Sequence, residues 1–162
     1  MSVKVYQDED ADLLDLQNKV CAVIGFGSQG HANALNLMDS GIDVIVGLYP
    51  GSKSIPIAQE HGLRVLDVAE AAQKADVIFF ATPDLRIAEI YERQVVPHLG
   101  TGKTLLFSHG FAIHFQTLIP PKDVDVVMVA PKAPGHIVRR QYQEGKRCSR
   151  VDRRFSESLN AG

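Results

Sequence analysis

Cysteine is scarce in this sequence, with two residues among 162, and tryptophan is absent. Cys21 and Cys148 lie far apart and form no C-x-x-C motif, so the sequence indicates neither a disulfide framework nor a zinc site. This cysteine usage is typical of a reducing compartment, and we expect a cytoplasmic protein.

Neither sign of charge dominates, because 17 Lys and Arg residues stand against 19 Asp and Glu residues for a formal net charge of −2. This balance predicts no general attraction to nucleic acid or to an anionic membrane. No apolar run reaches the ~20 residues of a membrane span, and the acidic N-terminus (Asp8, Glu9, Asp10, Asp12) resembles neither a signal peptide nor a transit peptide. The length suits one domain with a sizeable core.

An apolar run over residues 20–24 leads into a glycine triplet with the spacing G-x-G-x-x-G at Gly25, Gly27 and Gly30. The pattern predicts a strand, a tight turn and a helix. Gly25 allows the sharp turn, Gly27 leaves room for a pyrophosphate to approach the backbone, and Gly30 allows the helix to pack closely on the strand. Since the first N–H groups of a helix favour an anion, we interpret the turn as a dinucleotide-binding site. A purely structural glycine turn is the alternative.

Strand and helix patterns alternate after this turn. We expect strands at residues 43–48, 63–66, 76–81, 103–108 and 124–130, and helices from the glycine turn to Ser40, at 57–61, at 68–74 with Asp67 as N-cap, and at 85–93. The alternation predicts a Rossmann-type α/β fold, a doubly wound parallel sheet in three α/β/α layers, with ligands at the carboxyl ends of the strands. Residues 1–145 form this domain. The arginine-rich residues 146–162 show no strand pattern, and we interpret them as a divergent or disordered basic tail.

The loop after the second strand indicates which dinucleotide binds. Domains that take NAD usually place a carboxylate there, about 20 residues after the glycine turn, whereas this loop begins with Tyr49 and the next acid is Glu60. Ser52, Lys53 and Ser54 instead offer two hydroxyls around a cation, which suits a 2′-phosphate and predicts NADP over NAD. A solvated turn with a capping serine is the alternative. Tyr49 is able to stack on the adenine in either case.

Two side chains that follow later strands are candidates for chemistry. His109 precedes a glycine after the fifth strand, where an imidazole can reach a substrate or the nicotinamide, although a structural histidine is the alternative. Lys132 sits in a loop that Pro131 and Pro134 stiffen, and a solvated loop lysine is the alternative. Asp84 is expected to cap a helix rather than to transfer protons. The sequence contains no H-E-x-x-H motif, and no expected helix carries paired carboxylates suited to a divalent metal, so we predict no metal ligand.

Three motifs carry a specific resemblance: GFGSQGHA at residues 25–32, SHGFAIHF at 108–115, and APKAPGH at 130–136 continuing to residues 138–140. On these motifs the chain resembles the N-terminal domain of ketol-acid reductoisomerase, from about Val3 to Gly145. The residues expected to contact NADP(H) are Gly25, Phe26, Gly27, Ser28, Gln29, Gly30, Tyr49, Ser52, Ser54, Thr82, Pro83, Asp84 and Gly135.

The resemblance implies an oxidoreductase of branched-chain amino-acid biosynthesis. In that family a magnesium-dependent alkyl migration in 2-acetolactate or 2-aceto-2-hydroxybutyrate precedes hydride transfer from NADPH. The resemblance implies that His109 lies near the nicotinamide and that Lys132 joins the polar network around the metals and the substrate. The family's magnesium carboxylates come from a C-terminal helical domain that is not recognisable here, so we expect a truncated chain that is inactive alone.

Two further expectations follow from these observations. A sheet edge left unpaired after the sixth strand favours self-association. The alternative function is a non-catalytic NADP-binding module that acts as a sensor or binds a partner.

Overall fold

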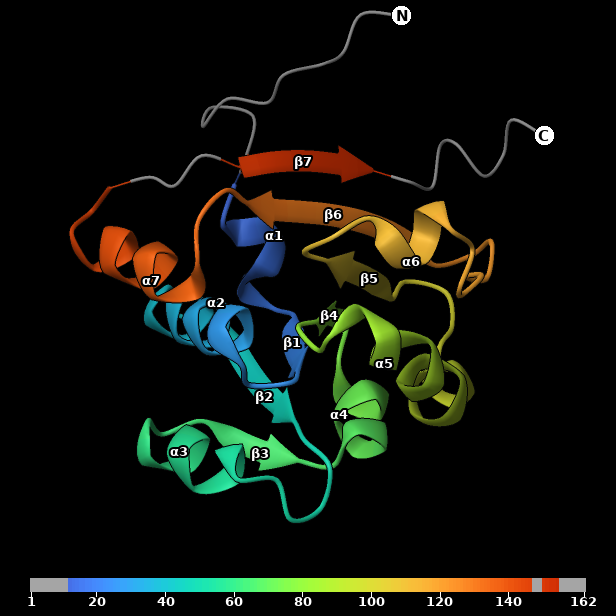
Figure 1. Ribbon diagram of the computed structural model, residues 1–162, viewed down its shortest axis with the longest axis horizontal. Coiled ribbons are helices and arrows are strands. Elements are labelled where there is room, and N and C mark those ends of the chain that lie inside the picture. The colour runs from blue at the N-terminus through green and yellow to red at the C-terminus, as the bar shows by residue number, and fades with distance from the viewer. Residues whose placement is uncertain (1–11, 147–149, 155–162) are drawn as a thin grey trace, which may run out of the picture.

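The computed structural model describes residues 12–146 and 150–154. Its centre is a seven-stranded sheet in the order β3-β2-β1-β4-β5-β6-β7 (Figure 1). The strands are β1 (Val20–Ile24), β2 (Asp43–Gly47), β3 (Arg64–Leu66), β4 (Val77–Phe80), β5 (Thr104–Phe107), β6 (Asp125–Pro131) and β7 (Arg150–Arg154). The first six strands are parallel, which confirms the Rossmann-type fold, and β7 pairs with β6 in the antiparallel direction.

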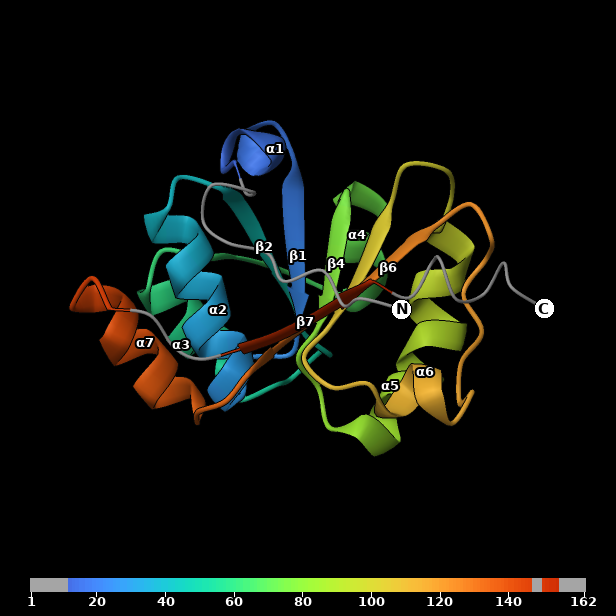
Figure 2. The ribbon, with the colours of Figure 1, turned by 90° about the horizontal axis from the view of Figure 1, so that it is seen from above.

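Helices cover both faces of the sheet. They are α1 (Leu14–Gln17), α2 (Ser28–Asp39), α3 (Ser54–Glu60), α4 (Val68–Lys74), α5 (Asp84–Ile90), α6 (Phe111–His114) and α7 (Gly135–Gln143). A π-helical turn, η2 (Tyr91–Val95), and a 3₁₀ turn, η3 (Val96–His98), follow α5. Figure 2 shows α2, α3 and α7 on one face and α4, α5 and α6 on the other, which confirms the three layers. In the part of the chain described, no helix combines the length and apolar character needed to cross a membrane.

Strand β1, an inner strand of the sheet, is buried on both faces because its side chains alternate between two apolar layers. Cys21 and Val23 belong to the layer that includes Leu35 of α2, whereas Ala22 and Ile24 belong to the layer that includes residues of α4 and α5. A fully buried strand of this kind reads as a continuous apolar run, which explains why the sequence predicted its position well.

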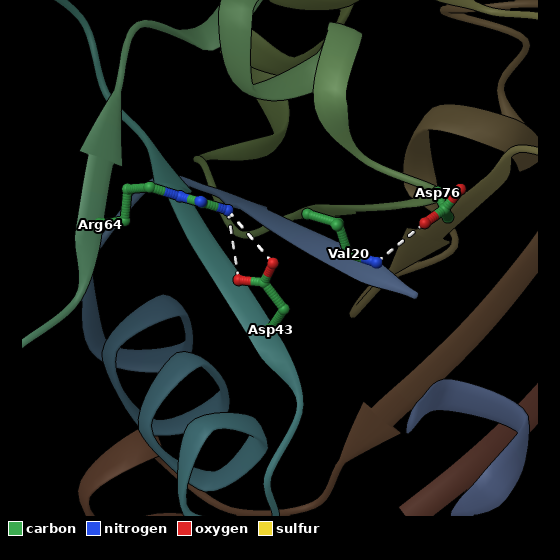
Figure 3. A network of polar contacts seen from close by, with 4 residues as sticks. All are labelled: Val20, Asp43, Arg64 and Asp76. Atoms are coloured by element: carbon green, nitrogen blue, oxygen red, sulfur yellow. Dashed lines mark hydrogen bonds and ion pairs between the residues drawn. The ribbon is translucent and has the colours of Figure 1, made fainter. Parts of the chain in front are cut away.

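Carboxylates fix the amino ends of the strands (Figure 3). Val20 N–H donates to Asp76 Oδ2 at 2.8 Å, which ties the start of β1 to the residue before β4. Arg64 at the start of β3 donates to both carboxylate oxygens of Asp43 at the start of β2, at 3.2 and 3.3 Å. These contacts lie at the amino ends of the strands. The glycine turn lies at the opposite side of the sheet, at the carboxyl end of β1.

The prediction that residues 146–162 contain no strand is wrong. Residues 150–154 form β7, whose backbone pairs with Val127 to Pro131 of β6. The physical reason is that the ladder is made by backbone groups, so an arginine-rich segment without an apolar pattern still satisfies the edge of β6. The unpaired edge on which we based the expectation of self-association is therefore covered. Residues 147–149 and 155–162 of the predicted tail lie outside the described part.

Three local predictions have different outcomes. Asp67 caps α4 as expected, because its Oδ1 accepts from Glu70 N–H at 2.8 Å. Asp84 is not an N-cap: Pro83 holds that position without a side-chain bond, and Asp84 is the first helical residue. The helix expected at 85–93 is interrupted, since it becomes π-helical after Ile90. Helices α6 and α7 were not predicted.

Candidate functional site

The glycine turn after β1 gives each glycine a separate role. Gly25 has a φ of +100°, and a Cβ there would lie 2.9 Å from Thr82 Cγ2 and 3.0 Å from Ala81 O. At Gly30 a Cβ would lie 3.0 Å from the carbonyl carbon of Gly25, so α2 packs directly on the turn. Gly27 is exposed, and no described atom lies within 4 Å of a Cβ placed there. The open space at Gly27 is therefore available to a ligand.

A cleft of about 290 Å³ lies at the carboxyl ends of β1, β2 and β4. Eight of the predicted cofactor residues line it: Gly25, Phe26, Gly27, Tyr49, Ser52, Ser54, Thr82 and Pro83. Much of the remaining wall is apolar, including Leu48, Val68 and Ile90. Among the described residues that line the cleft, Arg86 is charged and none is a carboxylate. An apolar wall with one cation fits an anionic ligand that carries an aromatic group.

The loop after β2 holds its two serines in different surroundings. Ser52 is buried, with 7% of its surface exposed, and its Oγ accepts from Ser54 N–H at 3.3 Å. This bond matches the capping alternative, but it uses an acceptor site and leaves the Ser52 O–H free to donate to a ligand. Lys53 is exposed and does not line the cleft, while Tyr49 is 65% exposed and does.

Thr82 provides an unpaired polar atom at the cleft. Its Oγ1 is buried and has no hydrogen-bond partner among the described residues. Leaving a buried hydroxyl unsatisfied costs about 1–3 kcal/mol. Because Oγ1 has almost no exposed surface, the side chain would have to rotate for Oγ1 to reach a ligand in the cleft, and a hydrogen bond formed there would remove this cost.

Several predicted cofactor residues pack against the β6–α7 loop instead of lining the cleft. Gly135 N–H donates to Ser28 Oγ at 3.0 Å, and Gln29 Nε2 donates to Ala133 O at 2.9 Å. A Cβ on Gly135 would overlap the backbone carbonyl of Ser28. Ser28, Gln29 and Gly135 therefore join the first turn of α2 to the start of α7. Gly30 instead packs against Gly25 and Ala81.

A second and more open groove of about 500 Å³ adjoins the turn at Gly27 and is lined in part by Ser28, His31 and Arg139. Burial is the main cause that lowers the pKa of His31, with contributions from His61 and Arg139. Arg139 is already engaged, because it contacts Asp39 at 2.7 Å and Asn36 Oδ1 at 2.8 Å. The groove therefore offers less free positive charge than its residue types suggest.

The two catalytic candidates lie at the same edge of the sheet but do not line the cleft. His109 follows β5 and its side chain is 67% exposed. Its Nδ1 accepts from Phe111 N–H at 3.2 Å, which requires the tautomer with the proton on Nε2, and Asp84 Oδ2 lies 3.7 Å away. Lys132 is exposed after β6. The structure brings His109 and Asp84 together, and it does not bring Lys132 into contact with them.

Residues 15–151 match the family described as the acetohydroxy acid isomeroreductase, NADPH-binding domain, which is most of the chain. The chain belongs to the ketol-acid reductoisomerase family. A solved NADH-preferring ketol-acid reductoisomerase from an uncultured archean is 44% identical, with a TM-score of 0.88 over 94% of this chain. The match covers 47% of that protein, so this chain spans about half of its length.

More distant reductases share the fold. An imine reductase from Myxococcus stipitatus in complex with NADP⁺ is 25% identical over 73% of this chain and 43% of its own, with a TM-score of 0.58. A pyrroline carboxylate reductase from Plasmodium falciparum with NADP bound is 18% identical over 86% of this chain and 49% of its own, with a TM-score of 0.64. These matches show that the chain shares the Rossmann-type fold with other reductases.

The residues present fit the dinucleotide of the ketol-acid reductoisomerase family but not its metal. The cleft, the open position at Gly27 and the unpaired Thr82 Oγ1 are the features that fit a nicotinamide dinucleotide. Within residues 12–146 and 150–154, no group of three or more His, Cys, Asp or Glu side chains is arranged to hold a metal ion.

Sequence reasoning missed eight residues that line the cleft, and three of them, Arg86, Ile90 and Gln94, lie on one helical segment. They are four residues apart along α5 and η2, so they recur on one side of a helical segment. The spacing predicts that they share one side of a helix that begins directly after a strand end of the site. Nothing in the sequence shows that this side faces the turn rather than solvent.

Proposed function

We propose that the cleft binds NADPH and that the chain is the nucleotide-binding part of a ketol-acid reductoisomerase. The observation that carries this proposal is the composition of the cleft. An open glycine at the start of α2, two serines from the loop after β2 and an unpaired threonine hydroxyl surround a space without a lining carboxylate in the described part.

Each group has a defined task in this proposal. The N–H groups at the start of α2 face the pyrophosphate beside Gly27, where no side chain intervenes. Ser52 and Ser54 donate to the 2′-phosphate, and the apolar wall with Tyr49 accommodates the adenine. Thr82 Oγ1 hydrogen-bonds a polar group of the cofactor. When bound, NADPH supplies a hydride.

The preference for NADPH over NADH is part of the proposal. The family is described as NADPH-binding, whereas one of its members, 44% identical to this chain, is NADH-preferring. Recognition of NAD usually relies on a carboxylate that binds the ribose hydroxyls. The described lining of this cleft contains no carboxylate, and the loop after β2 contributes two hydroxyls. These features favour the phosphorylated cofactor.

The reaction is inferred from the family. We propose that the intact protein reduces 2-acetolactate or 2-aceto-2-hydroxybutyrate after alkyl migration. His109 would act beside the nicotinamide and Lys132 in the polar network around the substrate, since both follow strands at the edge that holds the cleft. The metal that assists the migration would have to be held by groups other than the residues described here.

Calorimetric titration with NADPH and NADH tests the proposal. We expect tighter binding of NADPH, and we expect the Ser52→Asp, Ser54→Asp double variant to lose that preference because like charges repel the 2′-phosphate. Gln59→Asp is the matched control, because Gln59 is exposed on α3 and outside the lining. Equal affinities in the unmodified chain, or a preference for NADH, would refute the phosphate recognition.

A second assay separates an enzyme from a binding module. NADPH oxidation is followed by absorbance with acetolactate and magnesium present. Because no metal cluster is found in the described residues, we expect binding without turnover from this chain alone. Metal-dependent turnover would contradict this expectation and would reveal a metal site that we have not located.

A further inference from the structure

We propose that Arg86 is a specificity-determining residue that supplies the positive charge for the 2′-phosphate of NADPH. The proposal rests on the proposed function of the cleft. It differs from the sequence-based expectation because the cation comes from α5, not from Lys53 in the loop after β2.

The charges around the cleft lead to this assignment. Arg86 is the charged side chain among the described lining residues, and Lys53 does not line the cleft. A phosphate dianion that enters an apolar cleft loses hydration and needs a compensating cation. Hydroxyls such as those of Ser52 and Ser54 orient a phosphate but carry no charge. The planar guanidinium of arginine matches phosphate oxygens with two parallel hydrogen bonds.

The backbone of Arg86 is held firmly. Its N–H donates to Pro83 O at 2.8 Å in the first turn of α5. The next residue, Ile87, is 3% exposed, and Tyr91 at the end of the helix is 1% exposed, so α5 is anchored in the core on its inner side. A long side chain on a fixed backbone can reach into the cleft without moving the helix. The π-helical turn that follows is a feature often found at functional sites.

Glu89 holds the guanidinium in the described structure. Arg86 Nη2 lies 3.4 Å from Glu89 Oε2, and Arg93 Nη1 lies 3.4 Å from the other oxygen of the same carboxylate. Both pairs are largely exposed, and such pairs contribute little to stability. Arg86 can therefore exchange Glu89 for a phosphate at small cost.

Arg93 provides a matched control for the test. It is on the same helical segment, pairs with the same carboxylate and is similarly exposed, but it does not line the cleft. Arg86→Gln and Arg93→Gln are each titrated with NADPH, NADH, 2′,5′-ADP and 5′-AMP in the calorimeter. We expect Arg86→Gln to weaken NADPH and 2′,5′-ADP about tenfold or more, by loss of a charge-assisted bond. Binding of NADH and 5′-AMP should change less than about twofold, and Arg93→Gln should leave all four unchanged.

The other outcomes overturn the assignment in different ways. Equal losses for the phosphorylated and unphosphorylated ligands would mean that Arg86 stacks on the adenine. Unchanged NADPH binding in a folded Arg86→Gln protein would place phosphate recognition in the loop after β2 alone. Failure of the unmodified chain to bind any of the four ligands would instead refute the proposed function, and with it this inference.

Discussion

The change Gly27→Val separates ligand binding from folding most clearly. Gly27 has φ −80° and ψ −162°, a conformation that residues other than glycine adopt readily, and no described atom lies within 4 Å of an added Cβ. The expected cost to stability is that of a poorer N-cap for α2, about 1 kcal/mol. The protein should therefore fold with nearly unchanged stability. The isopropyl group, however, would fill the space beside the first N–H groups of α2.

The effect on binding is much larger. A pyrophosphate displaced from these N–H groups loses hydrogen bonds that contribute roughly 1.5–3 kcal/mol each when a charged group is involved. Loss of two such bonds amounts to about 3–6 kcal/mol, which is a weakening of NADPH binding by a factor of a hundred or more. Titration calorimetry gives the affinity, and urea unfolding followed by circular dichroism gives the stability.

Gly30→Ala is the matched comparison and should behave in the opposite way. Its Cβ would lie 3.0 Å from the carbonyl carbon of Gly25 and 3.2 Å from Ala81 Cβ, so helix and turn must separate. We expect a loss of about 1–3 kcal/mol of stability from overpacking.

One outcome would refute the reasoning about Gly27. If a folded Gly27→Val protein binds NADPH as tightly as the unmodified chain, the glycine triplet is structural only.

Other consequences concern stability and catalysis. Lys103 Nζ donates to carbonyls in the last turn of α4 and just after it, including Ala72 O at 3.0 Å. Lys103→Met should therefore lower the urea midpoint of unfolding by an amount equivalent to about 1–3 kcal/mol, and an unchanged midpoint would contradict this. Burial raises the pKa of Cys21 from 9.0 to about 11 and that of Tyr91 from 10.0 to about 12. The folded state keeps these protons to a higher pH than the unfolded state does, so the free energy of unfolding should fall by about 2–3 kcal/mol per group as the pH rises from 9 to 12. A urea midpoint that stays constant across this range would contradict the raised pKa values. His109→Ala and Lys132→Ala should leave the calorimetric NADPH affinity nearly intact, because neither residue lines the cleft; a large loss in either would place that residue in the binding site.

The parts of the fold that follow from local patterns were predictable. The glycine triplet and the buried strands are recognisable from short local sequence patterns, and Asp67 correctly predicted the start of α4. Strand β7 was missed because its position depends on the unpaired edge of β6, which is a long-range property. Helix α7 was missed because Gly135 and Pro134 at its start read as a loop, although the close approach to Ser28 is the reason that glycine stands there.

The candidate site was predictable only in part. Residues beside the glycine turn and after β2 were found because the turn spacing points to them. Arg86 and Gln94 were not, because their place in the cleft depends on how α5 packs on the sheet. The expected cap at Asp84 was wrong because the chain enters α5 through Pro83, one residue earlier than an Asp cap requires.

The most direct test of the account is a map of backbone amide chemical shifts in ¹⁵N-labelled protein during titration with NADPH. We expect the large changes at Gly25, Gly27, Ser52 and Thr82, at the carboxyl ends of β1, β2 and β4, with little change at Asp43 on the opposite edge of the sheet. Changes centred on the groove between α2 and α7, or no changes at saturating NADPH, would contradict the assignment of the cleft as the nucleotide site.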